Sequence, residues 1–194
     1  MPPLQILLAS SSIYRRQLLQ KLGVSFESAS PDIDEAALPG ETARQLVMRL
    51  AQAKANKLAQ THKHHLIIGS DQVATYENNI LGKPQNHDAA IGQLEQFSGR
   101  QITFLTSLCL LNSQEAQCQL SVESCTVKFR TLSKNQIESY LTKEQPYDCA
   151  GSAKSEGLGI ALLDAIVSDD PTALIGLPLI RTCQLLRAAG AVLP

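Results

Sequence analysis

Arg15 is a charged residue on the side of a predicted helix that faces the protein core. The predicted helix carries Leu18, Leu19 and Leu22. At about 100° per residue, Arg15 falls near the middle of this apolar stripe and Arg16 falls on its edge. A guanidinium at this place either extends along the surface to reach water or binds an anion.

Three serines separate this helix from a short apolar run. Leu4 to Ala9 predicts a buried strand, and Ser10, Ser11 and Ser12 follow it directly. Free backbone N–H groups at a helix start, serine hydroxyls and a guanidinium together form a site for phosphate. No GxxxxGK[ST] pattern is present, so this site is not a P-loop. A capped helix with no ligand is the alternative.

Lys54 and Asp71 are also charged residues in apolar surroundings. Lys54 lies four residues after Leu50 and four before Leu58, near the centre of the apolar stripe of a long helix. A buried lysine needs a carboxylate or a bound anion, unless its charge extends to water. Asp71 follows the strand residues 66–70, and aspartate is depleted in strands. Asp71 therefore either serves a site or caps a turn.

Lys83 lies on a stiff loop between Gly82 and Pro84 and is the last cation of this set. Taken alone, it is equally compatible with a solvated loop. Cations together with carboxylates suit a phosphate reaction that depends on Mg²⁺, because Mg²⁺ prefers a few carboxylates plus substrate phosphates. Structural ion pairs are the alternative. The candidate carboxylates are Asp32, Asp34, Glu35 and Asp71.

Composition limits the classes of function. The chain has 194 residues, of which 44% are hydrophobic and 18% charged, and its net charge is −1. This composition excludes a disordered chain and argues against a nucleic-acid polymer as partner, because a basic excess is missing. The N-terminus has neither a basic leader nor a membrane-length apolar run. The five cysteines form no CxxC pair, so we expect idle thiols in a cytoplasmic protein.

Periodicity predicts a mixed α/β sheet in one domain, residues 1–194, with two lobes around a cleft. Strands and helices alternate early, and a β-hairpin lies in the middle of the chain. Expected strands cover residues 4–9, 24–29, 65–74, 100–111 and 117–130, and a further short strand follows residue 159. One expected helix begins after Ser12. Further helices are expected over residues 42–60, 88–97, 133–142 and 171–189, and Ser133 is the expected N-cap of the third of these ranges.

A series of short motifs follows the chain over nearly its whole length: LLASSSIYRRQLL, DE at Asp34-Glu35, Lys54 in AQAKA, GSDQV around Asp71, GKP at Lys83, AGSAKSEG and IGLPL. With these motifs in this order, the chain resembles the Maf family of nucleoside triphosphate pyrophosphatases. The resemblance predicts a Maf/Ham1-like fold.

More narrowly, the chain is similar to the branch described as 7-methyl-GTP pyrophosphatases. Tyr14 before the two arginines, Gln72 after the aspartate and Glu156 in KSEG carry this similarity. Two positions depart from the family pattern. Ile13 replaces a usual proline, which we expect to loosen the loop slightly, and Tyr14 replaces a usual tryptophan, which weakens stacking and makes base selectivity less certain.

The resemblance implies hydrolysis between the α and β phosphates, which yields a nucleoside monophosphate and pyrophosphate. It implies that Asp71 accepts a proton from the attacking water and that Glu35 and Asp71 hold a divalent cation, Mg²⁺ or Mn²⁺. It further implies a homodimer. The implied phosphate-binding residues are Ser10, Ser12, Arg15, Arg16, Lys54 and Lys83.

Methylation at N7 makes guanine cationic, which suggests a rationale for the base preference. Glu156 would complement that charge and Tyr14 would stack on it. Gln72 would bond the base edge or orient Asp71. The alternative for Glu156 is a simple ion pair with Lys154. Two other functions stay open at this point: hydrolysis of pyrimidine (dTTP, UTP) or other non-canonical nucleotides, and nucleotide-dependent regulation of cell division.

Overall fold

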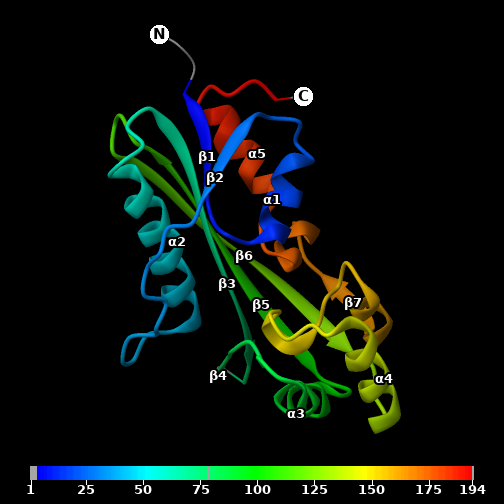
Figure 1. Cartoon of the computed structure of the whole chain (residues 1–194). Coiled ribbons are helices and arrows are strands. Elements are labelled where there is room, and N and C mark those ends of the chain that lie inside the picture. The colour runs from blue at the N-terminus through cyan, green and yellow to red at the C-terminus, as the bar shows by residue number, and fades with distance from the viewer. Residues whose placement is uncertain (1–3, 78, 194) are drawn as a thin grey trace.

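The computed structural model describes residues 4–77 and 79–193, so residues 1–3, 78 and 194 of the expected domain lie outside it. The described residues form one seven-stranded mixed sheet with the order β2-β1-β3-β5-β6-β7, and β4 pairs with β3 (Figure 1). The strands are β1 (Gln5–Ala9), β2 (Phe26–Ala29), β3 (His65–Tyr76), β4 (Asn79–Leu81), β5 (Gln101–Asn112), β6 (Gln117–Phe129) and β7 (Leu163–Val167).

The sheet confirms the predicted mixed α/β class. β1 runs parallel to both β2 and β3, whereas β3, β5, β6 and β7 pair antiparallel in turn. The predicted central hairpin is the β5–β6 pair. The helices are α1 (Ile13–Gln20), α2 (Ala43–Ala59), α3 (His87–Phe97), α4 (Lys134–Glu144) and α5 (Leu179–Ala188).

Helices cover both faces of the sheet around β1, which explains why residues 6–9 of this strand are all apolar instead of alternating with polar residues. Leu7 and Ala9 pack with α2 on one face, while Ile6 and Leu8 pack with α1 and α5 on the other (Figure 1). A separate core lies at the other end of the sheet, where α3 and α4 pack around Phe104. β3 runs through both halves and connects these cores.

The helix starts follow local capping signals. Ser133 accepts the backbone N–H of Gln136 and so caps α4, as predicted. Thr42 caps α2 in the same way, and Ser12 caps α1. Among the described residues, no helix is both long and apolar enough to cross a membrane.

The helical stretch expected over residues 171–189 is divided into two helices. A 3₁₀ helix, η3 (Pro171–Ile175), ends at Gly176, whose φ is 127°, and α5 begins only after Pro178. A positive φ and a proline both interrupt a helix, although the apolar pattern continues across them. Two further 3₁₀ helices, η1 (Ala150–Ser152) and η2 (Leu158–Leu162), precede β7. The short strand β4 was not predicted.

Candidate active site

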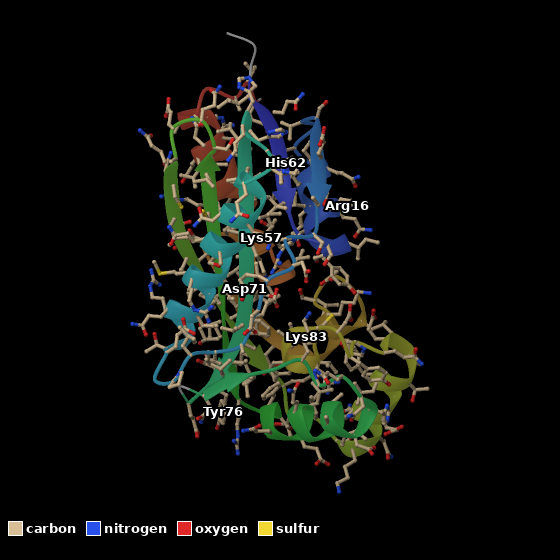
Figure 2. All side chains as sticks on the ribbon, turned by 60° about the vertical axis from the view of Figure 1, so that its left-hand side comes forward. Arg16, Lys57, His62, Asp71, Tyr76 and Lys83 are labelled. Carbon is tan, nitrogen blue, oxygen red and sulfur yellow. The ribbon has the colours of Figure 1, made fainter. Side chains whose placement is uncertain are left out.

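A cavity of about 850 Å³ lies between the two halves of the molecule. Its walls come from the end of β1, the start of α1, α2 and the middle of β3 on one side, and from the loop after β4 and the segment before η1 on the other. Figure 2 labels Asp71 on the central strand and Lys83 on the loop that follows β4. Nine of the predicted site residues line this cavity: Ser10, Ser12, Tyr14, Arg15, Glu35, Lys54, Asp71, Gln72 and Lys83.

Lys54 is buried between two carboxylates at the wall of this cavity. Its ammonium lies 2.7 Å from Oδ1 of Asp71 and 2.7 Å from Oε1 of Glu35. Lys54 is 5% exposed and Asp71 is 6% exposed. A carboxylate partner is therefore present for the buried lysine, and its charge does not extend to the surface.

Gly69 explains how α2 brings Lys54 to Asp71. A Cβ atom at Gly69 would collide with the backbone carbonyl of Ala51, so α2 lies directly against β3 at this point. The close approach places the lysine over the strand position that carries Asp71. The glycine that precedes Ser70 and Asp71 is thus required by packing.

Ser107 holds the backbone beneath Asp71, and sequence reasoning missed it. It lies opposite Asp71 in the β3–β5 register, accepts the Asp71 N–H at 3.1 Å and donates to the Val47 carbonyl at 2.6 Å. Ser107 is fully buried. Its only signal was a hydroxyl inside an apolar strand, where a buried polar group needs partners.

Electrostatics keep Glu35 ionised. Burial disfavours its charged form, but the hydrogen bond from Lys54 and the charges of Lys54, Lys83 and Arg15 outweigh that cost and lower the pKa of Glu35 below 4.5. Burial lowers the pKa of Arg15, while the charges of Asp71 and Glu35 oppose the change. Cations and carboxylates therefore lie next to one another in this cluster, and their charges interact.

Ser10, Ser12 and Arg15 form a polar cradle at the start of α1. The Ser12 N–H donates to Ser10 Oγ at 3.1 Å, and Arg15 Nη1 lies 3.5 Å from the same oxygen. Arg15 Nε donates to the carbonyl of Gly176 at 2.8 Å, which fixes the guanidinium against the segment after η3. Hydroxyls, helix N–H groups and a fixed guanidinium together suit phosphate oxygens.

The structure does not bring Arg16 into this cradle. Arg16 is exposed and faces a separate depression with Phe26 and Ser28, away from the cavity (Figure 2). Lys83, in contrast, is exposed but lines the cavity, and it has no ion-pair partner within the described parts of the chain. Its charge is therefore available to a ligand.

A side pocket of about 110 Å³ adjoins the main cavity and contains the residues predicted to select the base. Tyr14, Gln72 and Glu156 all line it, and Tyr14 and Gln72 also line the main cavity. Burial, with the neighbouring Cys149 and Asp148, raises the pKa of Tyr14 to about 12. The ring therefore stays neutral at physiological pH.

The alternative ion pair between Glu156 and Lys154 is absent. Lys154 Nζ lies 3.0 Å from Oε1 of Glu144 instead. Glu156 is exposed at the pocket rim and accepts a hydrogen bond from Ser155 at 3.4 Å. Its carboxylate is thus available to a positive ligand.

Gln72 holds the η3 segment in place, which the sequence did not indicate. Its Nε2 donates to the carbonyls of Ala173 at 2.8 Å and Leu174 at 3.0 Å, and to Thr106 Oγ1 at 2.9 Å. The amide nitrogen is therefore occupied by protein acceptors, which leaves the Oε1 acceptor for a base.

Asp32 and Asp148 also line the cavity, but Glu35 and Asp71 are the two carboxylates that pair with Lys54 and that we expect to hold a divalent cation. Each accepts from Lys54 through one oxygen, which leaves its second oxygen for another ligand. The described residues contain no group of three or more His, Cys, Asp or Glu side chains arranged to hold a metal. A donor set of two carboxylates fits Mg²⁺ or Mn²⁺ when substrate phosphates and water complete the coordination.

A family model and sequence relatives match this chain over nearly its full length. The family model described as Maf-like protein matches residues 5–189. The chain is 55% identical over 190 residues to a 7-methyl-GTP pyrophosphatase from Methylobacillus flagellatus, with 98% of each chain covered. It is 54% identical over 191 residues to one from Pseudomonas fluorescens, with 98% of this chain and 100% of that one covered. Among solved structures, the Staphylococcus aureus Ham1 protein aligns with a TM-score of 0.45 and 15% identity over 64% of this chain and 71% of that chain.

Proposed function

Since this chain belongs to the Maf family, we propose that it is a nucleoside triphosphate pyrophosphatase that hydrolyses 7-methyl-GTP to 7-methyl-GMP and pyrophosphate. The observation that carries this proposal is the buried Lys54 between Asp71 and Glu35, at the wall of a cavity with a phosphate cradle. Relatives named 7-methyl-GTP pyrophosphatase match this chain over nearly their whole length.

Asp71 is the proposed proton acceptor. Its Oδ1 accepts from Lys54, and Oδ2 is free to accept a proton from a water molecule in the cavity. The resulting hydroxide attacks the α phosphorus, and pyrophosphate leaves. The Lys54 ammonium holds the Asp71 carboxylate at the cavity wall, where it is positioned to act as a base.

The phosphate cradle supplies binding and charge stabilisation. Ser10, Ser12 and Arg15 contact the phosphates from the α1 side, and Lys83 contacts them from the opposite loop. Phosphoryl transfer depends mainly on such positioning and electrostatic stabilisation. Arg16, exposed outside the cavity, supports no direct phosphate contact in this arrangement.

Glu35 would hold a divalent cation, Mg²⁺ or Mn²⁺, through the oxygen that Lys54 leaves free, and Asp71 would hold it through the remaining lone pair of Oδ1, because each oxygen of an ionised carboxylate has two lone pairs. When bound, such an ion neutralises charge on the phosphate oxygens. The chain's own contribution is to keep Glu35 ionised and to hold Asp71 in place through Lys54 and Ser107.

The side pocket is the proposed base site. Tyr14 stacks on the base, Glu156 complements the positive charge that N7 methylation creates, and the free Oε1 of Gln72 accepts from the base edge. A homodimer and a cytoplasmic location are further expectations from the family, and sedimentation of the purified protein tests the first of them.

A nucleotide panel tests the proposed substrate. Pyrophosphate release is measured from 7-methyl-GTP, GTP, dTTP and UTP with Mg²⁺ or Mn²⁺. The proposal requires the highest kcat/KM for 7-methyl-GTP. Preference for dTTP or UTP would assign the pyrimidine activity instead, and binding of nucleotides without pyrophosphate release would assign a regulatory protein.

A further inference from the structure

Lys154 links the two sides of the base pocket. Its ammonium lies 5.6 Å from the centroid of the Tyr14 ring and 3.0 Å from Oε1 of Glu144. Tyr14 belongs to α1, whereas Glu144 ends α4 in the opposite half of the molecule. The distance to the ring is within the range of a cation–π contact.

Both ends of this lysine are fixed. Its backbone N–H donates to the buried hydroxyl of Tyr140 at 3.1 Å. Glu144 is in turn held because its Oε2 accepts the Leu158 N–H at 2.7 Å. The carboxylate packs so closely on Gly157 that a Cβ atom there would lie 2.7 Å from Oε2. The ammonium is therefore presented to the ring by a rigid support.

The position of Lys154 over the Tyr14 ring limits how a base can stack on that ring. Tyr14 has two faces, and Lys154 lies over one of them, so a base can stack only on the other. The adjacent Glu144 carboxylate offsets the ammonium charge, which reduces its repulsion of a cationic base. The lysine thus orients the ring without opposing a methylated guanine.

We propose that Lys154 is a positioning residue for base recognition: paired with Glu144, it holds the Tyr14 ring in the orientation that stacks on the base. This inference rests on the proposed function, because it needs a purine in the side pocket. It adds a residue to the specificity set that sequence reasoning assigned to Tyr14, Gln72 and Glu156.

The variants Lys154→Met and Lys154→Arg test this role. Methionine keeps the aliphatic packing but removes the charge, so KM for 7-methyl-GTP rises about 3- to 10-fold while kcat changes less than about twofold. Arginine retains the cation and stays near the wild-type KM. Lys143→Met, on the exposed side of α4, is the matched control and leaves KM unchanged.

Two further measurements separate positioning from simple structural damage. In a Tyr14→Leu background, Lys154→Met has no additional effect on KM, because the ring it orients is gone. Calorimetric binding of 7-methyl-GMP weakens in Lys154→Met by the same factor as KM rises, and this readout needs no turnover. An unchanged affinity for 7-methyl-GMP, or an equal effect with and without Tyr14, overturns the proposal even if the enzyme hydrolyses 7-methyl-GTP. A wild type that binds 7-methyl-GMP but releases no pyrophosphate refutes only the proposed activity.

A separate observation concerns two thiols far from this pocket. Cys109 Sγ on β5 and Cys118 Sγ on β6 lie 2.8 Å apart, and both cysteines are free. They occupy diagonal positions of the hairpin, because Cys109 pairs with Leu120 and Cys118 with Leu111. A disulfide bond needs about 2.05 Å, so a small shift of the side chains closes the gap.

We also propose that Cys109 and Cys118 are a modification site that a low-molecular-weight disulfide, such as oxidised glutathione, converts to an internal disulfide. Cys109 is buried and Cys118 is partly exposed, so Cys118 reacts with the reagent first. Its thiolate bonds to one sulfur of the reagent and expels the other as a thiol. The Cys109 sulfur then attacks Cys118 Sγ and expels the second glutathione, and the Cys109 proton passes to the departing thiolate.

Mass spectrometry of the intact protein after incubation with oxidised glutathione tests this step. We expect two fewer alkylatable thiols, a linked pair of peptides that contain Cys109 and Cys118, and a thermal midpoint raised by about 5 °C through closure of the short hairpin loop. Cys109→Ser should retain a glutathione adduct on Cys118, and Cys183→Ser should behave as wild type. Five reactive thiols, or an unresolved adduct on wild-type Cys118, would overturn the proposal.

Discussion

Lys54 Nζ lies 2.7 Å from Asp71 Oδ1, and the two residues come from a helix and a strand that Gly69 allows to touch. Both side chains are almost fully buried. Breaking one partner of a buried pair leaves an uncompensated charge, which is costly. The same contact therefore contributes to the stability of the fold and holds the proposed proton acceptor in place.

Lys54→Met removes the charge between Glu35 and Asp71. Without the ammonium, the two carboxylates repel each other and Asp71 loses the contact that holds it in place, so kcat/KM falls about a hundredfold or more. Lys57→Met changes an exposed lysine on the same helix and should retain wild-type activity (Figure 2). Steady-state kinetics on both variants check this, and equal losses in the two would refute the assigned role of Lys54.

Arg15 and Arg16 provide a direct comparison between the sequence-based prediction and the structure. Arg15→Met should lower kcat/KM about a hundredfold, because this guanidinium lines the cavity and is fixed by Gly176. Arg16→Met should cost less than about twofold, because an exposed charge outside the cavity is screened by salt. If the two substitutions cost the same, the structural distinction between these neighbours has no functional meaning.

Glu156→Gln should lower the preference for the methylated base. Loss of a nearby carboxylate removes its attraction for the cationic ring, so the ratio of kcat/KM for 7-methyl-GTP over GTP falls about tenfold. Glu115→Gln, in the exposed β5–β6 turn, is the control. Full discrimination in Glu156→Gln would show that another group reads the charge of the base.

Glu35 makes stability depend on pH in one direction. Burial raises the pKa of Glu35, but the hydrogen bond and the charge of Lys54 lower it by more, so the folded-state pKa is below 4.5. A depressed carboxyl pKa stabilises the fold above pH about 4.5, and that stabilisation is lost as the pH falls through the folded pKa. Denaturant unfolding of wild type and Glu35→Gln between pH 7 and 3 should therefore show a difference that shrinks on acidification. A difference that grows with acid would contradict the assigned electrostatics.

Signals that are local in sequence predicted their structures well. Ser133 caps α4 as its spacing predicted, and the apolar run at residues 4–9 forms a strand. Lys54 was predicted to need a compensating partner because it interrupts an apolar stripe, but the pattern could not decide between a carboxylate and an anion. The deciding contact to Asp71 joins residues 17 positions apart on different elements.

Contacts between distant residues of ordinary type were not predictable. Ser107, which supports Asp71 from β5, is one small hydroxyl in an apolar strand. Gln72 was expected to face the base, but its amide nitrogen binds carbonyls about a hundred residues away along the chain. Lys154 was considered a partner of Glu156, its near neighbour in sequence, whereas folding places it against Glu144 and Tyr14. Periodicity describes which face of an element is buried, and it says nothing about which element lies across from it.

Pyrophosphate release from 7-methyl-GTP by Asp71→Asn tests the central claim most directly. Asparagine keeps the size of the side chain and can still accept from Lys54, while Glu35 continues to compensate the ammonium. We predict that kcat falls about a thousandfold or more, with thermal stability and binding of 7-methyl-GMP close to wild type. An Asp71→Asn variant that releases 7-methyl-GMP and pyrophosphate at the wild-type rate would contradict the account.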